Sequence, residues 1–320
     1  MLTSAVPVAR AQNCQTSGDL DDANRSAITT AAQHYFDMAA KGDAAILRQN
    51  AVGSLAADFS VVETAVRDHQ PDLAGAQATV KSVFLLEADG AVPIPHAEFY
   101  CGVFGKNGQT SGSAEFFLDN LAPGKYAVVI LDAIAAQARF NFSAVMQQVG
   151  NDWKLAGLFL KPVLVAGHDS DWFAARAREY KTRGQVHNAW LFYLEARNLV
   201  SSLPFMSTQA TDRLYDEFQS LQPADVPSEG KTADLVVGTT THKLTALFPA
   251  AVGNNLDLIV KYQASDVADT NQAYQSNVAV IKALVAKFPE VRDAFAGVVA
   301  RAVDPSGRDF GTLLAMKDIK

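Results

Sequence analysis

The chain has 320 residues, of which 49% are hydrophobic and 19% are charged, a composition typical of folded globular proteins. Its 34 acidic and 27 basic residues give a formal net charge of -7, which offers no electrostatic basis for binding nucleic acid. No apolar stretch approaches the ~18–20 residues that a membrane-spanning helix requires. The length predicts two or three domains, at roughly 100–200 residues each.

The first residues carry a short export pattern. Ala9-Arg10-Ala11 fits the A-x-A cleavage motif of secretory signals, with cleavage expected before Gln12. We therefore expect an exported protein, periplasmic or extracellular, in which residues 1–19 are a signal-peptide remnant and a flexible lead segment.

The chain has two cysteines, Cys14 and Cys101. In an oxidising compartment they would be free to form a disulfide; the alternative is that Cys101 is a buried strand residue and Cys14 a free thiol. The histidines show no HxxxH or HExxH spacing, and the glycines form no nucleotide-binding loop. We therefore predict no metal and no cofactor.

Residues 20–163 read as helices followed by strands. Apolar residues recur at helical spacing from Asp21 to Gly42, and a further helical stretch precedes Pro71. The period then changes to two, with tight turns at 106–108 and 150–152. The expected strands lie at 78–86, 99–103, 113–118, 126–131, 140–149 and 153–160. Helices followed by antiparallel strands predict an α+β fold.

Two segments carry a family resemblance. The helix segment HYFDMAAKGD and the hairpin GNDWKLAGLFLKP, at the two ends of this region, resemble the nuclear-transport-factor-like (ketosteroid-isomerase-like) family. The resemblance covers roughly residues 20–163 and implies a cystatin-like cone, in which helices pack on a curved antiparallel sheet around a pocket. The fold hosts enzymes, binding modules and scaffolds alike, so it implies no particular chemistry.

Residues 164–223 turn helical again. Aromatic and small residues from Phe173 to Ala196 fall at the offsets of one tetratricopeptide repeat, with a turn at Gly184-Gln185. We expect a single tetratricopeptide-like hairpin that packs on the preceding domain, with Trp172 and Trp190 as candidates for the interdomain contact.

A linker rich in Pro, Ser and acidic residues follows at 223–230. Beyond it the pattern predicts three strands, an amphipathic helix ended by Pro289, and a final hairpin around residues 304–307. Residues 224–320 therefore read as a small α+β domain of no recognised family, and we expect residues 231–320 to fold independently.

Four residues are candidates for lining the cone pocket. Tyr35 lies on the core side of the first helix, while Glu98 and Tyr100 share one strand face near His96. The alternative is that Tyr35 is a core aromatic and Glu98 a solvated strand residue, since buried acids are uncommon without a partner. The Asp/Tyr pair of the isomerases does not map onto these positions, so we assign no catalytic residue.

The sequence thus favours a non-catalytic, exported binding or protein-interaction module, with an unidentified protein or a small apolar ligand as partner. The competing hypothesis is a small-molecule enzyme, isomerase-like or hydrolase-like, that uses the cone pocket. A homodimer formed through the open sheet face is a further possibility.

Overall fold

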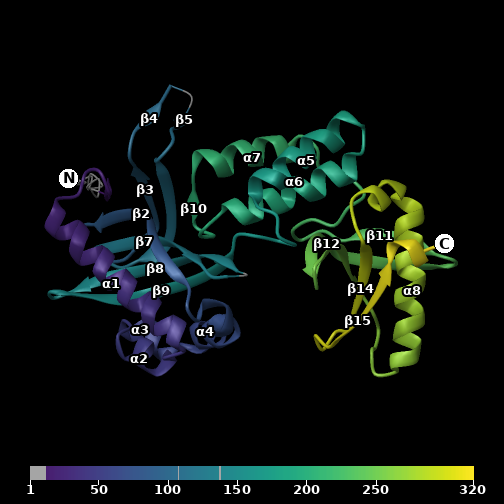
Figure 1. Cartoon of the computed structure of the whole chain (residues 1–320), viewed down its shortest axis with the longest axis horizontal. Helices are drawn as coiled ribbons and strands as arrows, with labels where there is room; N and C mark the ends of the chain where they lie inside the picture. Colours follow the sequence, from purple (N-terminus) through teal and green to yellow (C-terminus); the bar gives the residue numbers. More distant parts are fainter. Residues whose placement is uncertain (1–11, 107, 137) are drawn as a thin grey trace, which may run out of the picture. The chain divides into compact units, whose positions relative to one another are not determined.

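The computed structural model describes residues 12–106, 108–136 and 138–320 (Figure 1). The expected cleavage motif at residues 9–11 lies outside them. The described chain forms two compact units. The first unit holds the residues up to Val163 together with Ser201–Asp212, and the second holds Leu164–Val200 and Arg213–Lys320.

Four helices open the first unit: α1 (Asp22–Lys41), α2 (Ala44–Gln49), α3 (Gly53–Ala57) and α4 (Ser60–Leu73). The Asp21 carboxylate caps α1 by accepting a hydrogen bond from the Asn24 backbone N–H. Gly42 ends the helix in the left-handed conformation, with φ 77°, which costs a residue without Cβ little. Helix α1 lies against the sheet that follows (Figure 1). Its buried side chains belong to the same hydrophobic cluster as those of the sheet.

A five-stranded antiparallel sheet, in the order β1-β2-β7-β8-β9, forms the centre of the first unit. Its strands are β1 (Gln12–Thr16), β2 (Gln77–Ala88), β7 (Gly124–Ile134), β8 (Arg139–Val149) and β9 (Asp152–Pro162). One face of β7 packs on the helices and the other on a second sheet. Burial on both faces explains why residues 126–131 form a continuous apolar run rather than an alternating one.

The second sheet has the order β10-β6-β3, from β3 (Ile94–Cys101), β6 (Ala114–Leu121) and β10 (Met206–Ser207). Two short strands, β4 (Phe104–Gly105) and β5 (Gly108–Gln109), pair separately. The face of the large sheet that we expected to be open for dimerisation is therefore partly covered by a sheet of the same unit.

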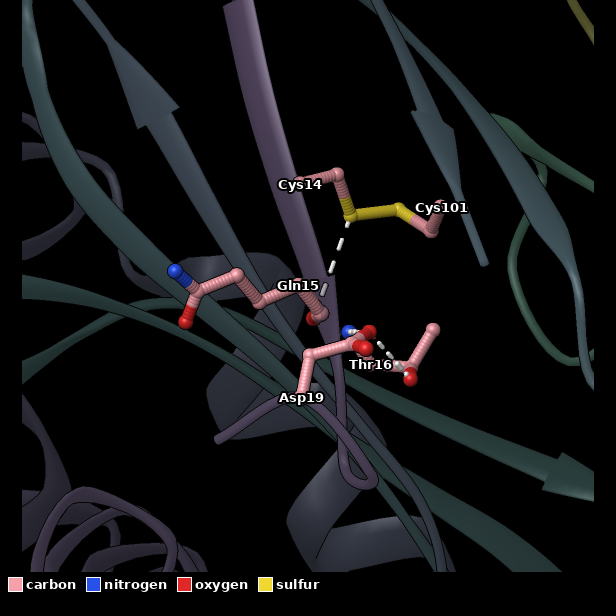
Figure 2. The surroundings of a disulfide bond; sticks show 5 residues. All are labelled: Cys14, Gln15, Thr16, Asp19 and Cys101. Carbon is pink, nitrogen blue, oxygen red and sulfur yellow. Dashed lines mark hydrogen bonds between the residues drawn. A yellow bond between two sulfur atoms is a disulfide. The ribbon is translucent and has the colours of Figure 1, made fainter. Parts of the chain in front are cut away.

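Residues 12–16 are a strand and not the flexible lead expected for residues 1–19. They pair with β2, and Cys14 of β1 forms a disulfide with Cys101 of β3, with 5.0 Å between the two Cα atoms (Figure 2). Asp19 closes the turn after β1, since its carboxylate accepts hydrogen bonds from both the backbone N–H and the hydroxyl of Thr16. Of the two alternatives for the cysteines, the structure has the bridged one, and it joins the edge strands of the two sheets.

The second unit begins with the helical hairpin α5 (Ser170–Thr182) and α6 (Val186–Val200), and α7 runs over Gln209–Gln219. Its sheet has the order β11-β12-β13-β14-β15, from β11 (Ala233–Val237), β12 (Thr240–Val252), β13 (Asn255–Gln263), β14 (Gly297–Val303) and β15 (Asp309–Ala315). Helix α8 (Thr270–Lys287) lies against β11, β14 and β15, and the short 3-10 helices η1 (Pro289–Asp293) and η2 (Met316–Asp318) complete the unit. The prediction of an α+β fold is confirmed, and no sheet of the described chain is closed.

The hairpin and the C-terminal segment share one hydrophobic core, a division that differs from the predicted boundary at 223/224. Phe192 of α6 contacts Phe295, with 5.8 Å between the ring centroids, and the Tyr180 hydroxyl donates to the Asp293 carbonyl. The predicted linker is packed as well: Val226 is buried in this core, and Asp225 pairs with His187. The hairpin aromatics thus complete the core of the C-terminal segment.

Candidate functional site

The two sheets of the first unit face each other across a buried apolar layer. Phe84 and Val128 of the large sheet meet Phe99 and Phe116 of the small one, and the Phe84 and Phe116 rings pack edge to face at 5.1 Å. The three strands of the small sheet cannot cover all five strands of the large one. The layer therefore opens into a cleft beside β8 and β9.

This inter-sheet cleft has a volume of about 390 Å³. Larger apolar side chains from both sheets and from the segment after α6 line it, beside polar surface of similar extent: Leu86, Leu118, Leu121, Tyr126, Val145, Phe159 and Phe205. The volume lies within the range of about 300–1,000 Å³ found for small-molecule sites.

A glycine keeps the cleft open at its base. A Cβ atom on Gly157 would lie 3.2 Å from the Phe159 ring and 3.6 Å from the Val145 Cβ. The first of these distances is shorter than ordinary van der Waals contact, so a side chain at Gly157 would either displace Phe159 or occupy the cleft. The sequence Ala-Gly-Leu-Phe in β9 therefore provides space as well as apolar surface.

Phe205 forms one wall, and it comes from the segment 201–212 that returns to the first unit. Its ring packs edge to face on Phe159 at 5.5 Å, and its carbonyl accepts a hydrogen bond of 2.9 Å from the Phe117 backbone N–H. Buried Asn141 donates to the Ser202 hydroxyl at 2.9 Å, which fixes the start of the same segment. Two hydrogen bonds and one ring contact thus hold this wall against both sheets.

The polar groups of the cleft are few and neutral, apart from Asp119. Ser54, Asn120 and Gln147 line it, and their side chains have no hydrogen-bond partner in the part of the chain that the structure describes. Asn120 adopts the left-handed conformation with φ 51°, one of two described residues other than glycine that do so. The Tyr126 hydroxyl already donates to the Ala122 carbonyl, and burial raises its pKa. The free groups suit a ligand with one or two hydrogen-bonding atoms.

The structure does not bring the four predicted pocket residues together. Tyr35 is buried in the core between helices and sheet, and its hydroxyl donates to the carbonyls of Asn50 and Trp153. His96, Glu98 and Tyr100 lie on the exposed outer face of β3, pointing away from the inter-sheet layer. The reading of Tyr35 as a core aromatic and of Glu98 as a solvated strand residue matches these positions.

Two close polar pairs involve these side chains, and one of them includes Asp119 at the edge of the cleft. The His96 Nδ1 atom lies 2.7 Å from Asp119 Oδ1, and the Tyr100 hydroxyl donates to Glu98 Oε2 at 2.9 Å. The hydrogen bond to Glu98 and its charge raise the pKa of the Tyr100 hydroxyl. The side chains of His96 and Asp119 are 83% and 84% exposed, so water surrounds both.

The two tryptophans predicted to make the interdomain contact have ring contacts inside the second unit. The Trp172 ring stacks on His168 at 3.7 Å, and the Trp190 ring stacks on Phe218 of α7 at 5.6 Å. Each partner belongs to the same unit as its tryptophan. Phe192, Tyr180 and His187 make the contacts that join the hairpin to the C-terminal segment.

Sequence reasoning missed the inter-sheet cleft itself. The expected pocket lies between helices and sheet, where the structure has a contiguous cluster of buried apolar side chains that includes Tyr35, Phe36 and Phe142. The sequence signal for a sheet covered on both faces was the unbroken apolar run at 126–131, because a strand with one exposed face would alternate apolar and polar residues.

The described residues contain no group of three His, Cys, Asp or Glu side chains placed to hold a metal ion. Among them, too, no helix is both long and apolar enough to span a membrane. Comparison of the chain with protein-family models, with curated proteins and with solved structures finds no match. Its function therefore has to be argued from the site alone.

Proposed function

We propose that this chain is a non-catalytic binding protein that holds a small apolar ligand in the inter-sheet cleft. One observation carries the proposal: a cleft of about 390 Å³ lined by apolar side chains, with free neutral groups on Ser54, Asn120 and Gln147. Burial of apolar ligand surface supplies the affinity, at about 25 cal/mol per Å² before the costs of association. The three polar groups would fix the ligand's orientation.

The proposal includes export to an oxidising compartment. The A-x-A motif at residues 9–11 and the Cys14–Cys101 disulfide support it, because structural disulfides persist where thiols are not kept reduced. Membership of the nuclear-transport-factor-like family stays part of the proposal as well. Its support is the order of helices before an antiparallel sheet in residues 20–163.

Titration with the neutral fluorescent dye 1-aminoanthracene tests the binding proposal. The exposed residue Ala122 borders the cleft, so Ala122→Trp would place an indole over the opening without entering the core. We expect saturable binding to the wild-type chain and an affinity at least about tenfold lower for Ala122→Trp, a change of about 1.4 kcal/mol. Val61→Trp is the matched control, because Val61 is 75% exposed on α4 and does not line the cleft.

Unchanged binding by Ala122→Trp would place the dye elsewhere and refute the proposal. Absence of saturable binding to the folded wild-type protein would refute it equally.

The His96–Asp119 pair is the one observation that favours an enzyme. A carboxylate on a histidine Nδ1 is the base-orienting part of a hydrolytic triad. Such groups act best in a site that excludes water, whereas both of these side chains are largely exposed. We expect His96→Ala to leave dye binding unchanged, and hydrolysis of a simple aryl ester that disappears in this variant would favour the enzyme instead.

A further inference from the structure

A second pocket lies in the second unit, at the carboxyl end of β13. Strands β13 and β14 are parallel, and α8 forms the connection between them. The other neighbouring strands of this sheet are antiparallel, so β13, α8 and β14 form its single unit of the kind that makes up open α/β sheets, in which ligands bind beyond the carboxyl ends of the strands. The pocket of this unit is at that position: it is lined by the residues that follow β13 and by the first turns of α8.

The pocket has a volume of about 270 Å³, smaller than the inter-sheet cleft. The beginning of β12 closes one side with Thr240, Thr241 and His242. Gln272 and Ser276 of α8 close another side. The His242 ring packs edge to face on Tyr262 at 5.1 Å, which fixes the orientation of the imidazole.

Seven polar side chains of this pocket have no hydrogen-bond partner within the described chain: Thr240, Thr241, His242, Gln263, Ser265, Gln272 and Ser276. The next residue of α8 shows the contrast. The Asn277 side chain accepts from the Tyr262 hydroxyl at 2.8 Å and donates to the Phe310 carbonyl and the Thr312 hydroxyl, both at 3.0 Å. The unit thus satisfies its buried amide within the chain, whereas the polar side chains around the pocket, most of them exposed to solvent, remain available to a ligand.

The charges near the pocket are balanced or suppressed. Burial lowers the pKa of His242, so the imidazole stays neutral at neutral pH. Asp266 carries the one carboxylate of the lining, and its Oδ1 atom accepts hydrogen bonds from two backbone N–H groups and from Arg308. An anionic ligand would meet the Asp266 carboxylate and no free cation, and a cationic ligand would have to compete with Arg308 for that carboxylate.

We propose that this pocket binds a neutral, polyhydroxylated small molecule of the size of a single sugar ring. Hydroxyl, amide and imidazole groups both donate and accept, so they match a ligand whose hydroxyl groups do the same. The methyl groups of Ala264, Ala273 and Ala302 give the pocket an apolar side for the C–H face of such a ring. This site is independent of the inter-sheet cleft and of the function proposed for it.

Backbone amide NMR of the full chain tests the proposal with two groups of probes. The neutral probes are D-glucose, D-galactose, N-acetyl-D-glucosamine and myo-inositol; the charged ones are D-glucuronate and D-glucosamine. We expect at least one neutral probe to shift the resonances of residues 263–276 in a saturable manner. The charged probe of the same ring size should bind at least about tenfold more weakly.

Two variants locate the binding site. Ser276→Phe should fill the pocket and weaken binding at least about tenfold, while Gln275→Phe, on the same helix but outside the lining, should leave it unchanged. His242→Ala removes a donor and acceptor without adding bulk and should also weaken binding, which covers the case that Ser276→Phe fails to fold. No saturable shift with any neutral probe, equal binding of charged probes, or unchanged binding by His242→Ala would overturn the proposal.

Discussion

Glu217 of α7 is the most highly connected carboxylate of the hairpin region. It accepts two hydrogen bonds from Arg178 of α5, at 2.8 and 2.9 Å, and a third from the Tyr193 hydroxyl of α6 at 2.6 Å. The bonds from Arg178 lower the pKa of Glu217 against the opposing effect of burial, and Tyr193 adds to the lowering. One side chain therefore ties three helices together.

This lowered pKa predicts an acid-sensitive contribution to stability. A carboxylate whose pKa is lower in the folded than in the unfolded state stabilises the folded state. This stabilisation is complete when the pH is above the pKa of the unfolded state, here near 4.5, and it is lost as the pH falls through the pKa of the folded state. Because Arg178 is half exposed, we expect Glu217→Gln to cost only about 1 kcal/mol at neutral pH. Urea denaturation as a function of pH should show this difference vanish in acid.

The matched control is Glu179→Gln on α5, which breaks the exposed pair with Arg176. Its cost should be smaller, because both side chains of that pair are about half exposed. A pH-independent cost for Glu217→Gln would contradict the assignment.

Asn277 connects three elements of the second unit, since it joins α8 to β13 and β15. Asn277→Ala would leave buried hydroxyl and carbonyl groups without their partner, at about 1–3 kcal/mol for each group that stays unsatisfied. We expect a loss of about 3 kcal/mol in chemical denaturation. Adding Tyr262→Phe to Asn277→Ala should recover part of the lost stability, because the second substitution removes one of the unpaired hydroxyl groups. If the costs of the two single substitutions simply add in the double variant, the network is contradicted.

The disulfide joins β1 to β3 and thereby one sheet to the other. The bond spans a sequence separation of 87 residues, which the chain-entropy model values at about 4–5 kcal/mol. Reduction should therefore lower the free energy of unfolding of the first unit by up to that amount, as measured by urea denaturation with and without reductant. The Cys14→Ala/Cys101→Ala variant should be destabilised similarly and should not respond to reductant; an equal response would contradict this account.

At the level of helices and strands, the sequence predicted most strands and the turns between them. Gly150 and Asn151 connect β8 to β9, within the turn expected at 150–152, and the final hairpin spans β14 and β15. Strand β1 was missed because QNCQT has no alternating apolar pattern; pairing with β2 and the bond at Cys14 make it a strand. The parallel pairing of β13 with β14 could not be predicted either, because hydrophobic periodicity indicates which faces of a strand are buried but not which strands pair.

For the whole molecule, the sequence placed a domain boundary where the chain has a shared core. Pro223 and the acidic residues after it read as a linker, but Val226 among them is buried. The apolar surplus of the hairpin was evident from its aromatics. The surface against which these aromatics pack was not evident. Phe192 contacts Phe295, about 100 residues further along the chain, and no local sequence pattern encodes a contact of that range.

The shared core predicts that the hairpin and the C-terminal segment lose stability together. Phe192 is 1% exposed and its ring contacts Tyr180 of α5 as well as Phe295. Phe192→Ala should cost about 3–5 kcal/mol. Hydrogen exchange should then show reduced protection in α5, α6, β13 and β14 alike.

Val186→Ala is the control for this prediction, since Val186 lies on the same helix and is 39% exposed. It should change protection little. Loss of protection confined to α5 and α6 would show that the hairpin is a separate folding unit after all.

The return of residues 201–212 to the first unit has a consequence for biosynthesis. A ribosome delivers β10 and Phe205 only after α5 and α6 have emerged, so the first unit cannot close in simple chain order. Phe295, which completes the core of the hairpin, is synthesised about 100 residues later. At ordinary translation rates this delay is about 5–20 seconds. During that interval the nascent chain exposes aromatic side chains that later residues cover in the folded protein. We expect chaperones or other nascent chains to bind it most readily at this stage.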